Sequence, residues 1–390
     1  MNVVLISTYE MGRQPFGLAS PAAWLRSSGM RVTCLDLSRD SLDATAVGEA
    51  DLVGFYVPMH TATRLAVEAL GAVRRLNSRA HVCFYGLYAP MNGPYLRRLG
   101  AHSILGGEFE EGLLSTALRV EEQRLAQNTL PPARSALEAQ QVEPVTSLAR
   151  LRFLAPDRRD LPPLARYARL DGLGGEPRVT GYTEASRGCK HLCRHCPVVP
   201  VYGGRFRVVQ SDVVLEDVRR QVALGAEHIT FGDPDFFNGI RHAIELVAAM
   251  HTEHPGLTYD VTIKVEHLLA YARHLETLRE TGCLFVTTAA EAVDDHILKR
   301  LDKGHNRADF ERVVGLFRRT GLGLAPTWVA FTPWTTLEGY CDLLDAIADL
   351  GIVEQVAPVQ LGIRLLIPAG SRLLELDEVR SLTEPFREAE

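Results

Sequence analysis

The chain has 390 residues, which is enough for two or three domains with buried cores. Its composition, 46% hydrophobic and 23% charged, is that of a globular protein, and it excludes a disordered chain and a small disulfide-stapled fold. The 42 Lys and Arg residues against 48 Asp and Glu residues give a net charge of −6, so the chain as a whole offers no electrostatic footprint for nucleic acid. We therefore expect no nucleic-acid partner.

Hydropathy and cysteine usage predict a cytoplasmic protein with no membrane partner. No uninterrupted apolar stretch approaches the roughly 18 residues that span a bilayer, and the first residues, MNVVLISTYEMGRQ, carry no basic leader before their apolar run. The chain has seven cysteines, an odd number, which fits a reducing compartment better than a disulfide framework.

In chain order, residues 2–118 alternate short apolar runs with helical patterns. Strands are expected at 2–8, 31–37, 51–57, 80–86 and 102–107, and helices at 18–28, at 62–76, near Tyr95 and from about Glu110. Such alternation is typical of βαβ units in which helices cover both faces of a parallel sheet. The sequence therefore predicts an α/β fold that begins with a doubly wound, parallel-sheet domain over residues 1–120.

Residues 121–178 interrupt this rhythm. The prolines at 131 and 132 and the segment APDRRDLPPLARYARL give this stretch a high density of proline and charge. That composition marks a linker or a segment that wraps a neighbouring domain. A glycine cluster at 172, 174 and 175 ends the stretch just before the next expected strand.

Residues 179–370 return to strand-then-helix order. Strands are expected at 179–188, 228–236, 259–265, 283–291, 323–331 and 356–367, with helices at about 210–224, 239–254, 267–281, 294–302, 308–319 and 337–350. Six sequential units with right-handed crossovers predict a partial (β/α)6 barrel, with its ligand site at the C-terminal ends of the strands. Residues 371–390 are a C-terminal segment for which a continuation beyond Glu390 stays open.

Three cysteines stand together at the end of the first barrel strand, in the sequence GCKHLCRHCPV. Cys189, Cys193 and Cys196 are separated by three and then two residues. Soft thiolates suit iron–sulfur clusters, and three of them would leave one iron of a cubane free for another ligand. Two alternatives stay open: a structural zinc site completed by His191 or His195, and three inert buried thiols. The other four cysteines fall in expected helices or strands and are interpreted as core residues.

This cysteine spacing on a strand-ending loop, followed by βα units, resembles the radical S-adenosylmethionine superfamily. The doubly wound domain before it is similar to that of the branch with an N-terminal cobalamin-binding domain. The resemblance implies a [4Fe-4S] cluster on Cys189, Cys193 and Cys196, whose free iron binds S-adenosylmethionine. Reduction would then yield a 5′-deoxyadenosyl radical that attacks a small-molecule substrate, with electrons from an external flavodoxin- or ferredoxin-type donor. The catalytic residues beyond the cluster ligands stay unknown.

The resemblance also assigns candidate residues for S-adenosylmethionine. Gly232, Asp233 and Asp235 follow the second barrel strand, where the superfamily binds the methionine amino group, although GDPD is also rich in turn formers. Lys264 and Glu266 lie at the end of the third strand, where period-2 alternation points them the same way. They are interpreted either as ligands for ribose or carboxylate or as an ion pair on the rim.

Later strands add further candidates. Glu291 ends the fourth strand and resembles the superfamily's glutamate that contacts S-adenosylmethionine. Lys303 is interpreted as a charge that stabilises a helix C-terminus, with Gly304 as the left-handed cap. Arg364 lies in the apolar sixth strand and needs an anionic partner, for which a carboxylate is the natural choice, unless it faces solvent at the barrel end.

The loops of the first domain suit a corrinoid. Gly86, Gly106 and Gly107 would let a flat ligand approach the backbone, while Thr61 and Thr63 resemble hydroxyl positions used for its nucleotide tail. The Asp-x-His-x-x-Gly sequence that supplies an imidazole to cobalt in many cobalamin domains is absent from residues 1–120. This absence argues against a histidine ligand rather than against cobalamin.

The leading hypothesis is a cobalamin-domain radical S-adenosylmethionine enzyme that transfers a methyl group to an unactivated centre of a small molecule. The alternative within the class is a non-methylating reaction, such as aminocarboxypropyl transfer or rearrangement, with a degenerate first domain. From a different class, a non-catalytic cobalamin- or zinc-binding module would share the same motifs.

Overall fold

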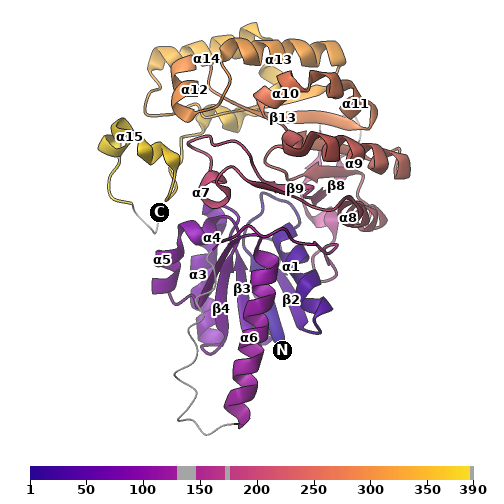
Figure 1. Ribbon diagram of the computed structural model, residues 1–390, viewed down its shortest axis with the longest axis vertical. Coiled ribbons are helices and arrows are strands. Elements are labelled where there is room, and N and C mark those ends of the chain that lie inside the picture. The colour runs from indigo at the N-terminus through magenta and orange to yellow at the C-terminus, as the bar shows by residue number, and fades with distance from the viewer. Residues whose placement is uncertain (130–145, 172–175, 387–390) are drawn as a thin grey trace. The chain divides into compact units, whose positions relative to one another are not determined.

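A computed structural model describes residues 1–129, 146–171 and 176–386 of the chain (Figure 1). The chain divides into two compact units, Met1–Ala168 and Arg169–Pro385. Among the described residues, no helix is long and apolar enough to cross a membrane.

The first unit is built on a parallel sheet of six strands in the order β2-β1-β3-β4-β5-β6. Its strands are β1 (Asn2–Ser7), β2 (Arg31–Asp36), β3 (Leu52–Tyr56), β4 (His81–Tyr85), β5 (Ser103–Gly107) and β6 (Thr146–Ser147). The order reverses direction between β1 and β3, as in flavodoxin-like sheets, where ligands bind beyond the carboxyl ends of the strands at that point.

Helices cover both faces of this sheet, as Figure 1 shows. Alternate strand residues such as Val3 and Leu5 pack with α1 and α6, whereas Val4 and Ile6 pack with α3 on the opposite face. The sheet is buried on both sides, which explains why its strands read as continuous apolar runs. The helices are α1 (Phe16–Ser27), α2 (Ala44–Gly48), α3 (His60–Leu76), α4 (Tyr88–Met91), α5 (Gly93–Arg98), α6 (Phe109–Thr129) and the 3₁₀ turn η1 (Leu164–Arg166).

Residues 146–168 belong to the first unit and follow α6 in the chain. Arg26 on α1 forms ion pairs with Asp157 and Asp160. Farther along, the Tyr167 hydroxyl donates a hydrogen bond of 2.9 Å to the Asp36 carboxylate in a buried setting. This stretch therefore wraps α1 and the end of β2 through specific polar contacts.

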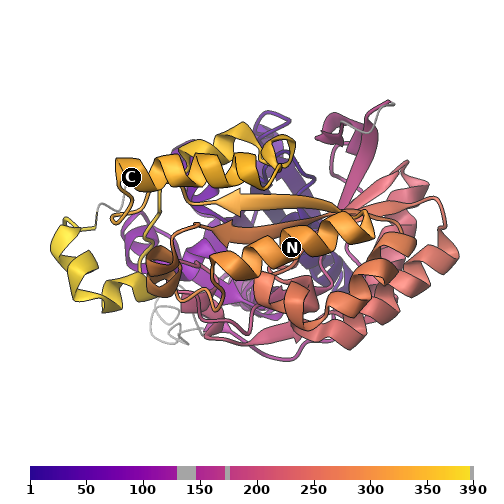
Figure 2. The same cartoon turned by 90° about the horizontal axis from the view of Figure 1, so that it is seen from above.

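The second unit contains a six-stranded sheet in the order β14-β13-β12-β11-β8-β7, and Figure 2 shows these strands flanked by helices. Five strands run parallel, and the short β7 pairs antiparallel at the edge. The strands are β7 (Arg169–Leu170), β8 (Arg178–Thr183), β11 (His228–Phe231), β12 (Thr258–Thr262), β13 (Cys283–Glu291) and β14 (Gly323–Trp328), and a separate antiparallel pair is β9 (Ser186–Gly188) with β10 (Phe206–Val208).

The helices of this unit follow the strands in sequence. In α13, Phe310, Val313, Val314 and Phe317 form one buried stripe with helical spacing. The helical segments are α7 (Val199–Tyr202), α8 (Ser211–Ala223), η2 (Phe236–Gly239), α9 (Ile240–Glu253), α10 (Val265–Ala270), η3 (Ala272–His274), α11 (Leu275–Glu280), α12 (Asp295–Leu301), α13 (Arg307–Thr320), α14 (Leu337–Asp349), η4 (Val353–Gln355), η5 (Pro358–Gly362), η6 (Arg372–Glu375) and α15 (Asp377–Leu382).

The strand expected at 356–367 is wrong. Pro358 begins the 3₁₀ turn η5, and the segment meets β14 through the side chain of Gln360, whose oxygen accepts a hydrogen bond of 3.1 Å from the Trp328 amide. Within residues 356–367, the only strand-like pairing is an isolated parallel bridge between Arg364 and Phe331. Proline cannot donate to a ladder, and this local chemistry outweighs the apolar pattern of the segment.

The wrapping segment yields a stability prediction. Tyr167→Phe removes the hydroxyl that donates to buried Asp36, so we expect the free energy of unfolding to fall by about 1.5 to 3 kcal/mol, the range for hydrogen bonds to charged groups. Urea unfolding of the full chain measures this loss. Tyr95→Phe, at a half-buried position on α5, is the matched control and should change stability little. Equal stability of the two variants would contradict the prediction.

Candidate active site

The cysteines lie on a loop of residues 189–205 that is closed at its base by β9 and β10. Gly188 and Phe206 are paired at the start of this antiparallel ladder. Gly188 has φ of +73°, and a Cβ there would lie 2.3 Å from the ring of Tyr202 and 2.5 Å from the Arg205 carbonyl oxygen. The loop therefore leaves the ladder through a conformation that only glycine accommodates.

The three thiols of this loop interact with one another electrostatically. The Cys196 amide donates a 3.2 Å hydrogen bond to the Cys193 carbonyl oxygen, which forms a tight turn. Burial raises the pKa of Cys189, with smaller increases from Asp235 and Cys193. Burial also raises the pKa of Cys196 to about 12, with smaller increases from Cys193 and Cys189. Cys189 and Cys196 are therefore protonated thiols in this structure, and a metal that binds them would release their protons.

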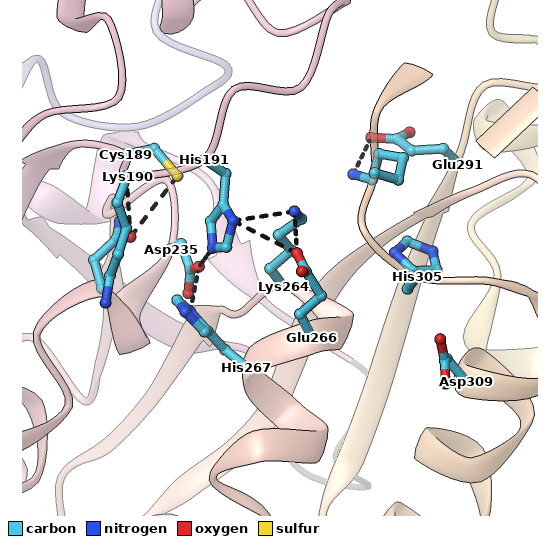
Figure 3. Close-up of polar contacts among 12 residues, drawn as sticks. Cys189, Lys190, His191, Asp235, Lys264, Glu266, His267, Glu291, His305 and Asp309 are labelled. Atoms are coloured by element: carbon cyan, nitrogen blue, oxygen red, sulfur yellow. Dashed lines mark hydrogen bonds and ion pairs between the residues drawn. The ribbon is translucent and has the colours of Figure 1, made fainter. Parts of the chain in front are cut away.

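A polar cluster adjoins Cys189 at the ends of β11 and β12 (Figure 3). The Asp235 carboxylate lies 2.7 Å from Nδ1 of His267 and 3.4 Å from Nε2 of His191. His191 also contacts the Lys264 ammonium at 3.2 Å, and Lys264 forms an ion pair with Glu266. Burial alone would raise the pKa of Asp235, but its contacts with His191 and His267 hold it below the usual range.

Three side chains of this cluster lie close enough together to hold a metal ion. Ligand atoms of Cys189, His191 and Asp235 lie within 4.8 Å of one another. The group includes a single cysteine, so a metal ion there would compete with a cluster on the three thiols. His195, the other candidate to complete a zinc site, has its Nε2 3.0 Å from the Glu291 carboxylate instead.

Glu291 ends β13 in a left-handed conformation with φ of +67°, which is strained for a glutamate. Its buried carboxylate accepts a 3.1 Å hydrogen bond from the Lys303 ammonium and contacts His195. Burial would raise the pKa of Glu291, but Lys303 and His195 together hold it far below the usual range. The expectation of Gly304 as the left-handed cap is wrong, since α12 ends at Leu301 and its left-handed cap is Asp302, with φ of +56°. Lys303 follows this cap, and its ammonium pairs with Glu291.

Gly232 and Asp233, which follow β11, both contact other groups of the protein. A Cβ on Gly232 would lie 1.7 Å from the Tyr182 hydroxyl, so this glycine is required by packing. The Asp233 carboxylate accepts hydrogen bonds from the Ala185 amide at 2.9 Å and the Ser186 hydroxyl at 2.6 Å. Asp233 thus positions the strand that leads into the cysteine loop, and of the GDPD residues only Asp235 joins the cluster beside Cys189.

Arg364, the last candidate residue of this unit, differs from the others because it is exposed to solvent. Arg364 lies on the segment after η5, and its exposure is consistent with the alternative in which it faces solvent.

Lys264 and Glu266 are not strand residues, because β12 ends at Thr262 and both lie at the N-terminus of α10. The structure nevertheless brings them together with His191, as Figure 3 shows.

In the first unit, the candidate corrinoid residues lie at the carboxyl edge of the sheet. Gly86 has φ of +108° beside the ring of Tyr56, and a Cβ on Gly107 would lie 2.0 Å from the Ser147 carbonyl oxygen. Gly106 lines a cavity of about 220 Å³ together with Leu105, Glu108, Phe109, Glu111, Gly112, Ser115 and Ser147. The glycines therefore serve packing within this unit, and Gly106 also borders an open space.

The two threonines lie at the start of α3. Thr61 is exposed, whereas the Thr63 hydroxyl donates a 3.0 Å hydrogen bond to the Met59 carbonyl oxygen. Thr8, after β1, donates a 2.9 Å hydrogen bond to the Ala62 carbonyl oxygen, which ties the β1 loop to α3 across the switch point. Of these threonines, Thr61 is the one whose side chain faces solvent.

Sequence reasoning missed His267 and the structural role of Lys303. His267 lies on α10 behind the expected strand end, and its spacing from Asp235 in sequence gives no signal of their contact. Lys303 and Glu291 are separated by a whole helix, so their ion pair follows only from the way α12 folds back on β13.

Comparison with known proteins identifies the domain that contains this site. Residues 183–333 match the model of the radical SAM superfamily, and this range contains the cysteine loop, the Asp235 cluster and Glu291. This segment of the chain is a radical SAM domain, which is a domain of enzymes, and the match implies a [4Fe-4S] cluster and S-adenosylmethionine.

Among curated proteins, the hopanoid C-3 methylase of Methylococcus capsulatus is 26% identical over 334 residues, which cover 81% of this chain and 62% of that protein. The chain spans less than two thirds of the length of the first curated relatives that it matches.

Solved structures share the fold of both units. The methyltransferase TsrM from Kitasatospora setae, solved with tryptophan and an S-adenosylmethionine analogue, has a TM-score of 0.66 and 20% identity over 90% of this chain and 72% of its own. The cobalamin-dependent enzyme OxsB has a TM-score of 0.69 and 13% identity over 98% of this chain and 62% of its own. The expected fold class, a doubly wound domain followed by a partial barrel, is confirmed.

The buried Asp233 predicts a pH effect on stability. Burial raises its pKa from 3.8 to about 7, against the hydrogen bonds from Ser186 and Ala185. Between these values the folded chain retains a proton that the unfolded chain has lost, so this contribution to the free energy of unfolding falls as the pH rises.

We expect Asp233→Asn to flatten that part of the decline in the free energy of unfolding, because the amide does not titrate. Its oxygen can accept from the Ala185 amide, and its NH2 group can donate to the Ser186 hydroxyl oxygen. Urea unfolding of the wild type and the variant from about pH 4 to about pH 7 tests this, since the window follows from the raised pKa. Asp349→Asn, at an exposed position, serves as the control. Parallel curves for wild type and Asp233→Asn would refute the role of this carboxyl.

Proposed function

We propose that this chain is a cobalamin-dependent radical S-adenosylmethionine enzyme that transfers a methyl group to an unactivated centre of a small molecule. The observation that carries the proposal is the loop of residues 189–205, with three neighbouring buried or half-buried thiols inside the segment that matches the superfamily. The first unit supports the cobalamin part through its flavodoxin-like strand order.

Cys189, Cys193 and Cys196 would hold the cluster, because soft thiolates are the usual ligands of iron–sulfur centres. When bound, the cluster and S-adenosylmethionine supply the radical chemistry, and the protein supplies orientation and exclusion of side reactions. Asp235, His191 and Lys264 present a carboxylate, an imidazole and an ammonium beside Cys189, so they would bind the charged groups of S-adenosylmethionine there.

Glu291 would act from the other side of the cysteine loop. Its carboxylate is kept ionised by Lys303 and lies at the C-terminal end of β13, where barrel enzymes place their ligand contacts. Arg364 and Glu266 are the more exposed members of the proposed set, so they would contact S-adenosylmethionine or substrate near the rim.

The first unit would hold cobalamin beyond the carboxyl edge of its sheet. Thr61 offers a solvent-facing hydroxyl at the start of α3, and Gly106 borders the cavity beside α6. Thr63, Gly86 and Gly107 would shape that edge through the packing described above. The relatives add support of a general kind, since TsrM has been solved with cobalamin and a [4Fe-4S] cluster bound.

Cys193→Ala tests the cluster. We expect loss of most of the bound iron after anaerobic reconstitution, because two thiolates cannot retain a cubane, and loss of 5′-deoxyadenosine formation with it. Iron and sulfide analysis measures the first effect. Cys341→Ala, which removes an exposed cysteine, should load as the wild type does. Full iron content in Cys193→Ala, or zinc in place of iron in the wild type, would contradict the proposal.

Cobalamin and methyl transfer require a separate measurement. After anaerobic reconstitution with hydroxocobalamin, the corrinoid should remain with the chain through gel filtration. Candidate small molecules incubated with S-adenosylmethionine carrying a deuterated methyl group should gain that label. Iron without retained corrinoid would instead favour a non-methylating radical enzyme with a degenerate first unit.

A further inference from the structure

The cysteine loop is fixed to the end of α12. The Arg194 amide donates a 2.9 Å hydrogen bond to the Leu301 carbonyl oxygen, and the Arg194 guanidinium donates a 3.0 Å bond to the Arg300 carbonyl oxygen. On its other side, the Ser371 hydroxyl donates a 2.9 Å bond to the Arg194 carbonyl oxygen. These three hydrogen bonds hold the residue directly after Cys193, so the middle of the loop is anchored by both backbone and side-chain groups.

The next residue of the loop is held by a buried charge pair. His195 lies with its Nε2 3.0 Å from the Glu291 carboxylate, and the same oxygen accepts a 3.1 Å bond from the Lys303 ammonium. The side chains of Lys303 and Glu291 are only 4% and 9% exposed. A pair buried to this degree needs each partner, because removal of one leaves an uncompensated charge.

This pair contacts His195, which directly precedes Cys196 and follows Cys193 by two residues, so its charges lie near two of the cluster cysteines. Burial would lower the pKa of Lys303, yet Glu291 and the thiols of Cys193 and Cys196 raise it. The reduction potential of an iron–sulfur cluster depends on nearby charge and solvent exposure. A cation beside its ligands favours the more negative, reduced form.

We propose that Lys303 is a positioning residue of the cluster site: through Glu291 it fixes His195 and the turn between Cys193 and Cys196, and its charge raises the reduction potential of the bound cluster. Glu291 acts with the opposite sign on the potential. This inference rests on the proposed function, because it requires a cluster on the three cysteines, but it requires neither cobalamin nor methyl transfer.

The test is a redox titration of the reconstituted chain. The electron paramagnetic resonance signal of the reduced cluster measures how much of the cluster is reduced at each potential. We expect Lys303→Met to shift the midpoint potential downward and Glu291→Gln to shift it upward. Lys303→Arg should stay near the wild type. A purely structural role would reduce iron loading without producing shifts of opposite sign. Lys299→Met, which removes an exposed ammonium on α12, is the matched control and should leave the potential unchanged.

A second comparison avoids an unpaired buried carboxylate, in case Lys303→Met does not fold. The double variant Lys303→Met/Glu291→Gln should have a lower potential than Glu291→Gln alone. Unchanged potentials in the variants, or shifts in the same direction, would overturn this inference while leaving the cluster in place. A wild-type chain that assembles no cluster would overturn the proposed function itself.

Discussion

The buried carboxylate of Glu291 is the interaction on which the candidate site depends. It is shared by His195 from the cysteine loop and Lys303 from the turn after α12, so it joins the loop to the barrel. Taking these charges out of water is costly, and the cost is offset only while all three groups stay in place. The positive φ of Glu291 fits this picture, because strain of this kind persists where the surrounding structure enforces it.

Much of the fold was predictable because its signals are local. The strands of the first unit are buried on both faces, and their apolar runs between helices identify a doubly wound sheet. The cysteine spacing likewise identified the loop before its geometry was known. The segment at 356–367 misled because apolar residues occur in both strands and packed turns, and Pro358 with the Gln360 side chain decided between them.

Most of the site could not be predicted because its contacts join distant parts of the chain. Asp235 meets His267 through the way α10 folds back after β12, and Gly232 is set by the Tyr182 hydroxyl rather than by a ligand. The sequence indicated that polar and charged residues occur at the ends of the barrel strands. Only the structure divides them into those that face the cysteine loop, such as Asp235, and those that support it, such as Asp233.

The central claim is that the loop of residues 189–205 holds a [4Fe-4S] cluster with one iron open to S-adenosylmethionine. The most direct measurement is the electron paramagnetic resonance spectrum of the reduced, reconstituted chain, recorded before and after S-adenosylmethionine is added. Our account predicts a [4Fe-4S] signal that changes on addition, because the ligand binds the open iron. A chain that shows no iron–sulfur signal, or one whose spectrum is unaffected by S-adenosylmethionine, would contradict it.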